Sequence, residues 1–281
     1  MVQPFRLQSD EGLPIRGDVD APATRGPVVV CVHGFKGFKD WGFWPETARR
    51  LSSAGYSVIR FNFSHAGVGE DCESFSEASL FESGTYSAEV ADLRRVLAGV
   101  EAGELPLADR MDASRIGLLG HSRGSISTLA VAASGEFSVR SVVLWNPVAR
   151  VLWWDEGQRR QWREKGFWEV VNTRTRQVFR VSTALLDDAE KNQEALDPVG
   201  NAGRLETPLL AVVAQEDESV PPESGIRLAR AVPAGSASFV EIPRTGHTFG
   251  AVHPFAGATA ALEEALRAAR EHFDRTLGGA R

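Results

Sequence analysis

Three residues of this chain, Ser122, Asp217 and His247, have the types and the order that nucleophilic catalysis requires. Ser122 lies at the centre of G-H-S-R-G (residues 120–124), the only G-x-S-x-G pentapeptide in the sequence. A serine hydroxyl is a weak nucleophile unless a histidine accepts its proton and a carboxylate orients that histidine. An apolar run precedes the pentapeptide and a helical pattern follows it, which is the context of a nucleophile on a sharp turn. The pattern predicts acyl transfer.

The acid has two alternatives in the sequence. Asp217 lies between Glu216 and Glu218 in the turn after the apolar run 209–214. Its place as the third residue after that strand favours Asp217, and both glutamates stay open as alternatives. Without a catalytic role, this segment would be a solvated acidic turn before the next helix.

The base has one alternative. His247 follows the predicted strand 238–242 on the loop before the last helix, where a catalytic base belongs. His253, further along the same loop, is the other candidate. His121, inside the pentapeptide, is expected to point away from the serine.

Acyl transfer also needs hydrogen-bond donors for the oxyanion of the intermediate. We expect one donor to be the backbone amide of Arg123, directly after the nucleophile. The other should be the amide of Phe35, in the loop 33–37 after the apolar run 28–32, where Gly34 permits a backbone twist. For the Arg123 side chain we expect an ion pair at the helix start, with substrate contact as the alternative.

Alternating strands and helices must position these groups. The predicted strands are 28–32, 56–63, 116–119, 139–145, 209–214 and 238–242. The predicted helices are 45–54, 86–102, one after Ser122, 223–231 and 256–277. Most of these strands are continuous apolar runs, which are typical of strands buried on both faces. The sequence therefore predicts an α/β fold with a mostly parallel, twisted sheet and helices on both faces. A hairpin is predicted over 4–20 and a long polar loop over 64–83.

Residues 148–206 are too many for an ordinary connection between two elements. We interpret them as a cap insertion over the site, between core segments 1–147 and 207–281; a longer edge of the core is the alternative. The segment is rich in tryptophan, and 167–181 resembles a hairpin around residues 172–175. Trp44, Trp153 and Trp154 are candidate substrate-binding residues, because aromatic walls suit a planar or acyl group. The alternative is that these rings pack the cap onto the sheet, and we expect about half of the aromatic side chains in the core.

The composition argues against several other classes of protein. The 281 residues carry a net charge of −6, and their 31 lysines and arginines form no basic stripe, so we expect no nucleic-acid partner. We also expect no signal peptide, no membrane span and a cytoplasmic location. Cys31 and Cys72 are expected to be reduced, with Cys31 a buried small hydrophobe. Without H-E-x-x-H or C-x-x-C, no metal site is expected.

Four motifs together resemble the α/β-hydrolase superfamily. They are H-G-F at 33–35, the pentapeptide at 120–124, D-x-x-V-P at 217–221 and G-H at 246–247. The resemblance runs from residue 28 to the C-terminus. The compact cap after W-N-P (145–147) and R-F-N-F-S-H-A-G at 60–67 are similar to the feruloyl/cinnamoyl esterase and dienelactone-hydrolase-like branch, where R-F-D-F-R-G-x-G is frequent. Asn62, Ser64 and His65 depart from that pattern.

The resemblance implies two-step hydrolysis of a small-molecule carboxylic ester through an acyl-enzyme, without a cofactor. Serine aminopeptidases and acylaminoacyl peptidases share the same signature, so amide hydrolysis stays open. Haloperoxidases, C–C hydrolases and acyltransferases also share the triad. A non-catalytic binding module is a further alternative, although such modules commonly lose a triad member, whereas all three positions are filled here.

Overall fold

An eight-stranded sheet forms the centre of the computed structural model, which describes residues 1–172 and 175–278. Its spatial order is β1 (Val2–Gln8), β2 (Pro14–Asp20), β4 (Ser57–Asn62), β3 (Gly26–Val32), β5 (Met111–His121), β6 (Val139–Trp145), β9 (Leu209–Ala214) and β10 (Ala237–Ile242). In this order the strands from β4 to β10 are parallel, β2 pairs antiparallel with β4, and β1 pairs antiparallel with β2. The predicted fold class is confirmed.

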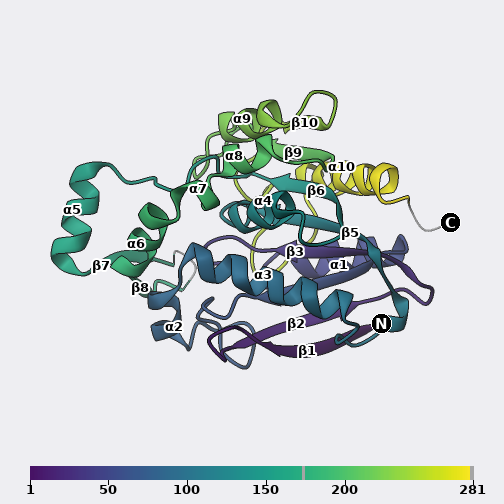
Figure 1. Ribbon diagram of the computed structural model, residues 1–281, viewed down its shortest axis with the longest axis horizontal. Helices are drawn as coiled ribbons and strands as arrows, with labels where there is room; N and C mark the ends of the chain where they lie inside the picture. The colour runs from purple at the N-terminus through teal and green to yellow at the C-terminus, as the bar shows by residue number, and fades with distance from the viewer. Residues whose placement is uncertain (173–174, 279–281) are drawn as a thin grey trace.

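Helices cover both faces of this sheet (Figure 1). One face carries α3 (Tyr86–Glu101), α4 (Gly124–Ser134) and α9 (Glu223–Ala231), and the other carries α1 (Trp44–Ser53) and α10 (Ala260–Thr276). Successive strand side chains point to opposite faces. In β3, Val28 and Val30 therefore belong to one buried cluster and Val29 and Cys31 to the other. This double burial explains the uninterrupted apolar runs of the sequence.

Residues 148–206 form elements of their own. These are α5 (Glu156–Lys165), β7 (Phe167–Val171), β8 (Val178–Ser182), α6 (Thr183–Lys191), α7 (Gln193–Leu196) and α8 (Pro198–Gly203). Strands β7 and β8 pair with each other, as the predicted hairpin requires, and do not join the large sheet. Within the predicted turn, residues 173 and 174 lie outside the described residues. Figure 1 shows α5, α6 and this hairpin beyond the end of the sheet, whereas α8 packs against α4 and α9.

The prediction of one long loop over 64–83 is wrong in its last part. Residues 78–83 form a short helix, α2 (Ala78–Ser83). Its one buried residue, Phe81, lies with its ring centroid 4.8 Å from that of Phe179 in β8. A six-residue helix with a single apolar anchor has no detectable periodicity, and contact with the hairpin stabilises it instead.

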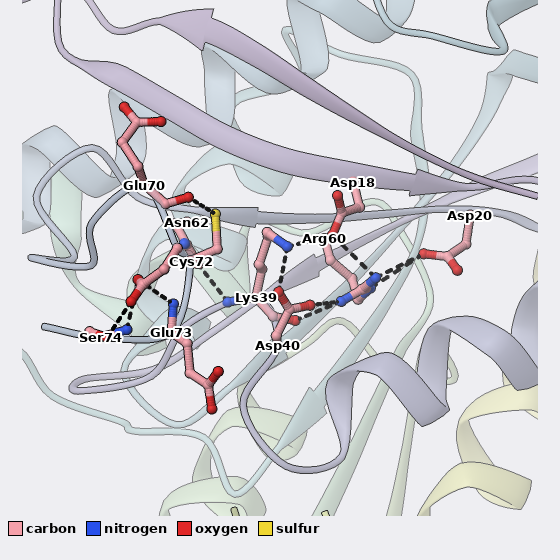
Figure 2. A network of polar contacts seen from close by, with 11 residues as sticks. Asp18, Asp20, Lys39, Asp40, Arg60, Asn62, Glu70, Cys72, Glu73 and Ser74 are labelled. Atoms are coloured by element: carbon pink, nitrogen blue, oxygen red, sulfur yellow. Dashed lines mark hydrogen bonds and ion pairs between the residues drawn. The ribbon is translucent and has the colours of Figure 1, made fainter. Parts of the chain in front are cut away.

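A buried network of charges holds the chain that follows the loop 33–37 (Figure 2). Lys39 Nζ forms ion pairs with Asp18, at 2.5 Å, and with Asp40. Arg60 pairs with Asp40 and, at 3.2 Å, with Asp20, and its Nη1 donates to the Lys39 carbonyl at 3.1 Å. The network therefore joins residues 39–40 to strands β2 and β4, which fixes the end of that loop.

The departures from the R-F-D-F-R-G-x-G pattern have local partners. Asn62 Oδ1 accepts a hydrogen bond from the Lys39 amide at 2.6 Å, a bond that an aspartate could also accept. The amide and hydroxyl of Ser64 donate to Asp92 Oδ2 at 2.7 and 2.8 Å. Burial raises the pKa of the Asp92 carboxyl to about 7, against the lowering effect of these two bonds. Asn62 thus holds the backbone of Lys39, and Asp92 holds that of Ser64.

Both cysteines are free thiols, and Cys31 is buried in β3, as predicted. Burial raises the pKa of the Cys31 thiol to about 12, so it stays protonated. Across residues 1–172 and 175–278, no helix has the length and apolar character that crossing a bilayer requires.

Candidate active site

Ser122 lies on a sharp turn between β5 and α4. Its φ is 54°, in the left-handed region that side chains with a Cβ rarely adopt. The Ser122 amide donates to the Trp145 carbonyl at 2.9 Å, which connects the turn to the end of β6. A Cβ at position 124 would lie 2.5 Å from the His33 carbonyl oxygen, so Gly124 allows the loop after β3 to pass close to the turn.

The structure brings Ser122, His247 and Asp217 together. His247 Nε2 lies 2.9 Å from Ser122 Oγ, and His247 Nδ1 lies 2.6 Å from Asp217 Oδ2. The other carboxylate oxygen, Oδ1, accepts hydrogen bonds from the amides of Ser219 and Val220 at 2.8 and 2.9 Å. The three side chains therefore form a continuous hydrogen-bonded chain, anchored at its acid end to the backbone after β9.

The environment of Asp217 favours its ionised form. Burial by itself raises the pKa of a carboxyl group. The hydrogen bond to His247, the charge of that ring and the two amides outweigh burial, so the pKa of Asp217 lies below its usual value. An ionised carboxylate accepts the Nδ1 proton of His247, which leaves Nε2 free to accept from Ser122.

The alternative acids and base lie elsewhere. Glu216 and Glu218 are exposed on the same turn as the buried Asp217. His253 accepts a hydrogen bond from the Gly42 amide at 3.1 Å and faces Glu73 at 3.2 Å. Both ring nitrogens of His253 therefore contact residues other than Ser122.

The loop after β3 lies beside the serine. A Cβ at position 34 would come within 2.9 Å of Ser122 Cβ, so glycine is required for this approach. Among the described residues, the backbone amides of Phe35 and Arg123 have no acceptor. The Arg123 side chain forms the predicted ion pair, with its Nη2 2.9 Å from Glu89 Oε1. Both amides are therefore available to a bound group, and the close approach at Gly34 brings this loop next to Ser122.

Two chambers meet at Ser122. The larger has a volume of about 640 Å³ and is lined by His247, Lys36 and Trp44 among others. The smaller, of about 270 Å³, lies against the segment 148–206 and is lined by Trp153 and Trp154. The structure thus places all three candidate substrate-binding tryptophans in chamber walls. Trp44 is also packed in the core, stacked on Trp145 with ring centroids 6.0 Å apart.

His121 contacts His247, a neighbour that the sequence did not indicate. Its ring centroid is 4.8 Å from that of His247, and its Nε2 is 3.0 Å from the His247 carbonyl oxygen. Burial, followed by the charge of His247, lowers the pKa of His121 to about 3, so this ring is neutral and its Nε2–H donates to the carbonyl. His121 therefore holds the backbone of His247 and does not contact the Ser122 hydroxyl.

Asn146, which the sequence did not single out, holds the same carbonyl. Its Nδ2 donates to the His247 carbonyl oxygen at 2.7 Å, and its Oδ1 accepts from the Ala214 amide at 2.7 Å. The residue is buried and left-handed, with a φ of 45°. The sequence held one signal for this role, an asparagine directly after the predicted strand 139–145. Asparagine adopts the left-handed conformation more readily than most residues. Asn146 thus links β6, β9 and the loop of His247.

We expect Asn146→Asp to lower kcat for ester hydrolysis by about 10-fold, or about 1.4 kcal/mol, because the buried His247 carbonyl keeps the donor of His121 but loses that of Asn146 and faces a carboxyl oxygen instead. Aspartate keeps the backbone conformation and the acceptor for the Ala214 amide. It loses the donor to the His247 carbonyl, so His247 shifts relative to Ser122. KM should stay nearly unchanged, because Asn146 lines neither chamber.

Asn201→Asp is the matched control. Asn201 is also buried, and its Nδ2 donates to the Ala195 carbonyl at 2.9 Å, in the segment 148–206. This variant should lose thermal stability without a selective loss of kcat. Equal kcat in wild type and Asn146→Asp would show that Asn146 does not position the histidine.

The chain belongs to the alpha/beta hydrolase family, whose model matches residues 29–262. None of the curated proteins matches the sequence. Within the described residues, no group of three His, Cys, Asp or Glu side chains could hold a metal ion.

Several solved structures share the fold. The α/β hydrolase GrgF from Penicillium sp. sh18 is 18% identical, with a TM-score of 0.74 and 99% of each chain covered. Est1E from Butyrivibrio proteoclasticus, one of whose structures contains ferulic acid, is 17% identical, with a TM-score of 0.71 over 98% of this chain and 99% of Est1E. A Mycobacterium tuberculosis puromycin-hydrolyzing peptidase is 20% identical, with a TM-score of 0.65; the match covers 99% of this chain and 39% of the peptidase. At these identities the likeness concerns the fold.

Proposed function

We propose that this protein is a serine hydrolase that cleaves carboxylic esters through Ser122, His247 and Asp217. The observation that carries the proposal is the hydrogen-bonded chain from the Ser122 hydroxyl through both nitrogens of His247 to a buried carboxylate. Membership of the alpha/beta hydrolase family supports the same chemistry. The strained backbone of Ser122 adds support, because such strain is retained mainly at functional sites.

In the proposed reaction, Ser122 Oγ attacks the ester carbonyl carbon while its proton passes to His247 Nε2. The amides of Phe35 and Arg123 bind the resulting oxyanion. When the tetrahedral intermediate collapses, the bond to the alcohol oxygen breaks and His247 returns the proton to that oxygen. Water then attacks the acyl-enzyme, with its proton passing through His247 to Ser122 Oγ, and the acid is released. No cofactor takes part in these steps.

The two chambers suggest how an ester lies in the site. The alcohol oxygen must reach His247 to receive its proton. His247 lines the larger chamber and not the smaller one. We therefore propose that the alcohol part occupies the larger chamber, beside Trp44. The acyl part would then occupy the smaller chamber, against Trp153 and Trp154. This assignment makes residues 148–206 a cap on a core of 1–147 and 207–281.

Labelling with a fluorophosphonate, followed by intact mass measurement and peptide mapping, tests the proposal. We expect one adduct per chain, on Ser122, because its Oγ lies within hydrogen-bond distance of His247 Nε2, the proposed base. A panel of p-nitrophenyl esters should show a preference among acyl groups, set by the 270 Å³ chamber. Folded protein that takes up no label and hydrolyses no ester would favour a non-catalytic binding module.

The same panel separates esterase from amidase. Matched p-nitrophenyl esters and p-nitroanilides of one acyl group differ only in the bond to be cleaved. Ester turnover without anilide turnover is the expected result. Comparable turnover of amino-acid anilides would instead favour a serine aminopeptidase-like or acylaminoacyl-peptidase-like activity.

A further inference from the structure

Lys36 combines a strained backbone with an unusual side-chain position. It follows Phe35 in the loop after β3, and its φ of 57° lies in the left-handed region. Strain of this kind in a residue with a Cβ persists where the surrounding structure requires it, often at binding sites. The Lys36 side chain reaches the hairpin β7–β8, with Nζ 3.0 Å from the Val171 carbonyl oxygen. The ammonium thus lies between the loop 33–37 and β7, in the wall of the larger chamber.

The charge of Lys36 has no counterion among the described residues. An ammonium group has three N–H donors. In the described parts of the chain, the Val171 carbonyl is the one acceptor within hydrogen-bond distance of Nζ, and no carboxylate lies within 4.0 Å. Partial burial lowers the pKa of the Lys36 ammonium, and no acidic neighbour opposes this effect. The group is therefore partly desolvated without an anionic partner.

The other basic side chains beside Ser122 have acidic partners. Arg123, in the wall of the smaller chamber, pairs with Glu89 at 2.9 Å. His253, in the wall of the larger chamber, faces Glu73 at 3.2 Å. Lys36 consequently gives the larger chamber a positive charge that its wall does not neutralise. An anion entering this partly desolvated place interacts with the charge more strongly than it would in water.

We propose that Lys36 binds a carboxylate on the alcohol part of the ester substrate. The proposal rests on the function proposed above, because the alcohol part is assigned to the larger chamber through its need to reach His247. A single ammonium is a compact point charge with rotatable donors, which suits one carboxylate. A phosphate dianion would favour an arginine fork, and the described residues that line the larger chamber include no arginine.

Two esters with the same acyl group test this inference. One is a 3-acyloxybenzoate, whose alcohol part carries a carboxylate, and the other is its methyl ester, in which that charge is removed. kcat/KM for both is measured in the wild type and in Lys36→Met, which removes the charge and the donor at similar length. Lys36→Arg keeps the charge. Lys191→Met, at an exposed residue of α6, changes the net charge of the protein by the same amount.

In Lys36→Met we expect the ratio of kcat/KM for the anionic ester to that for the neutral ester to fall about tenfold, mostly through KM. Lys36→Arg and Lys191→Met should keep the wild-type ratio within about twofold. In the wild type, raising the salt concentration should lower kcat/KM for the anionic ester only, because salt screens a partly exposed charge.

Two results would overturn the inference. An unchanged ratio in Lys36→Met would show that Lys36 does not recognise the carboxylate. An equal loss of kcat/KM for both esters would show that Lys36 acts through its hydrogen bond between the loop 33–37 and β7, and not by binding the carboxylate.

Binding measurements separate this inference from the proposed function. Calorimetry of 3-hydroxybenzoate and methyl 3-hydroxybenzoate with Ser122→Ala protein requires no turnover. The inference is supported if Ser122→Ala protein binds 3-hydroxybenzoate more tightly than its methyl ester and the Ser122→Ala, Lys36→Met double variant does not. This result counts even if neither ester is hydrolysed. Equal binding of both compounds contradicts it even if both esters are hydrolysed.

Discussion

Ser122→Ala is expected to lower kcat for ester hydrolysis by about 10⁴-fold or more, because the variant lacks the oxygen that forms the acyl-enzyme. The fold should be retained. Alanine has the same Cβ as serine, and the hydrogen bond from the backbone N–H of residue 122 to the Trp145 carbonyl does not depend on the hydroxyl. Initial rates with a p-nitrophenyl ester, together with a thermal melt, measure both effects. The fluorophosphonate adduct should disappear in parallel.

Ser127→Ala is the matched control. Ser127 is buried in α4, and its hydroxyl donates to the Gly124 carbonyl at 3.1 Å, so the same atom is removed five residues away. Its kcat should stay within a few-fold of the wild type. Full activity in Ser122→Ala would assign the nucleophile to another residue and would overturn the proposed mechanism.

Asp217→Asn is expected to lower kcat by about 10⁴-fold with little change in KM, through the wrong tautomer of the histidine. The amides of Ser219 and Val220 occupy Oδ1 of Asp217, and an asparagine oxygen would keep these two bonds. Its NH₂ group would then face His247 Nδ1 and turn that nitrogen into an acceptor. The proton would move to Nε2, which could no longer accept from Ser122.

Glu216→Gln and Glu218→Gln are the controls for this assignment, since both were open alternatives in the sequence. Both side chains are exposed, and their loss should leave kcat nearly unchanged. Steady-state kinetics of the three variants on one ester decide the question. If kcat of either glutamine variant fell as far as is expected for Asp217→Asn, the acid would have been assigned to the wrong residue.

Much of the fold could be predicted because it follows from local patterns. The β3 run 28–32 is apolar throughout, and such runs alternate with amphipathic helices, which defines a mostly parallel sheet. The order of Ser122, Asp217 and His247, each after the end of a strand, followed from the same pattern. The structure brings these side chains within hydrogen-bond distance. Their catalytic roles stay predictions for the variants above to test.

Other features depend on contacts that no local pattern encodes. Helix α2 forms against β8, almost one hundred residues further along the chain. Asn146 meets the His247 carbonyl across a separation of 101 residues, and Lys36 meets the Val171 carbonyl across 135. His121 was expected to point away from the serine, and its Nε2 contacts the His247 carbonyl and not the Ser122 hydroxyl; its place beside the His247 ring could not be predicted. Such side-chain directions follow from tertiary packing.

The stacking of Arg123 on Phe35 has a consequence for the motion of the site. The guanidinium carbon of Arg123 lies 5.1 Å from the ring centroid of Phe35 and 4.3 Å from that of Tyr86 in α3. The two residues whose amides are proposed to bind the oxyanion are thus joined through their own side chains. Because Glu89 in α3 also holds this guanidinium, its contact with the Phe35 ring restrains the loop 33–37 relative to the turn at Ser122. Donors that are restrained in this way need little reorganisation when negative charge develops.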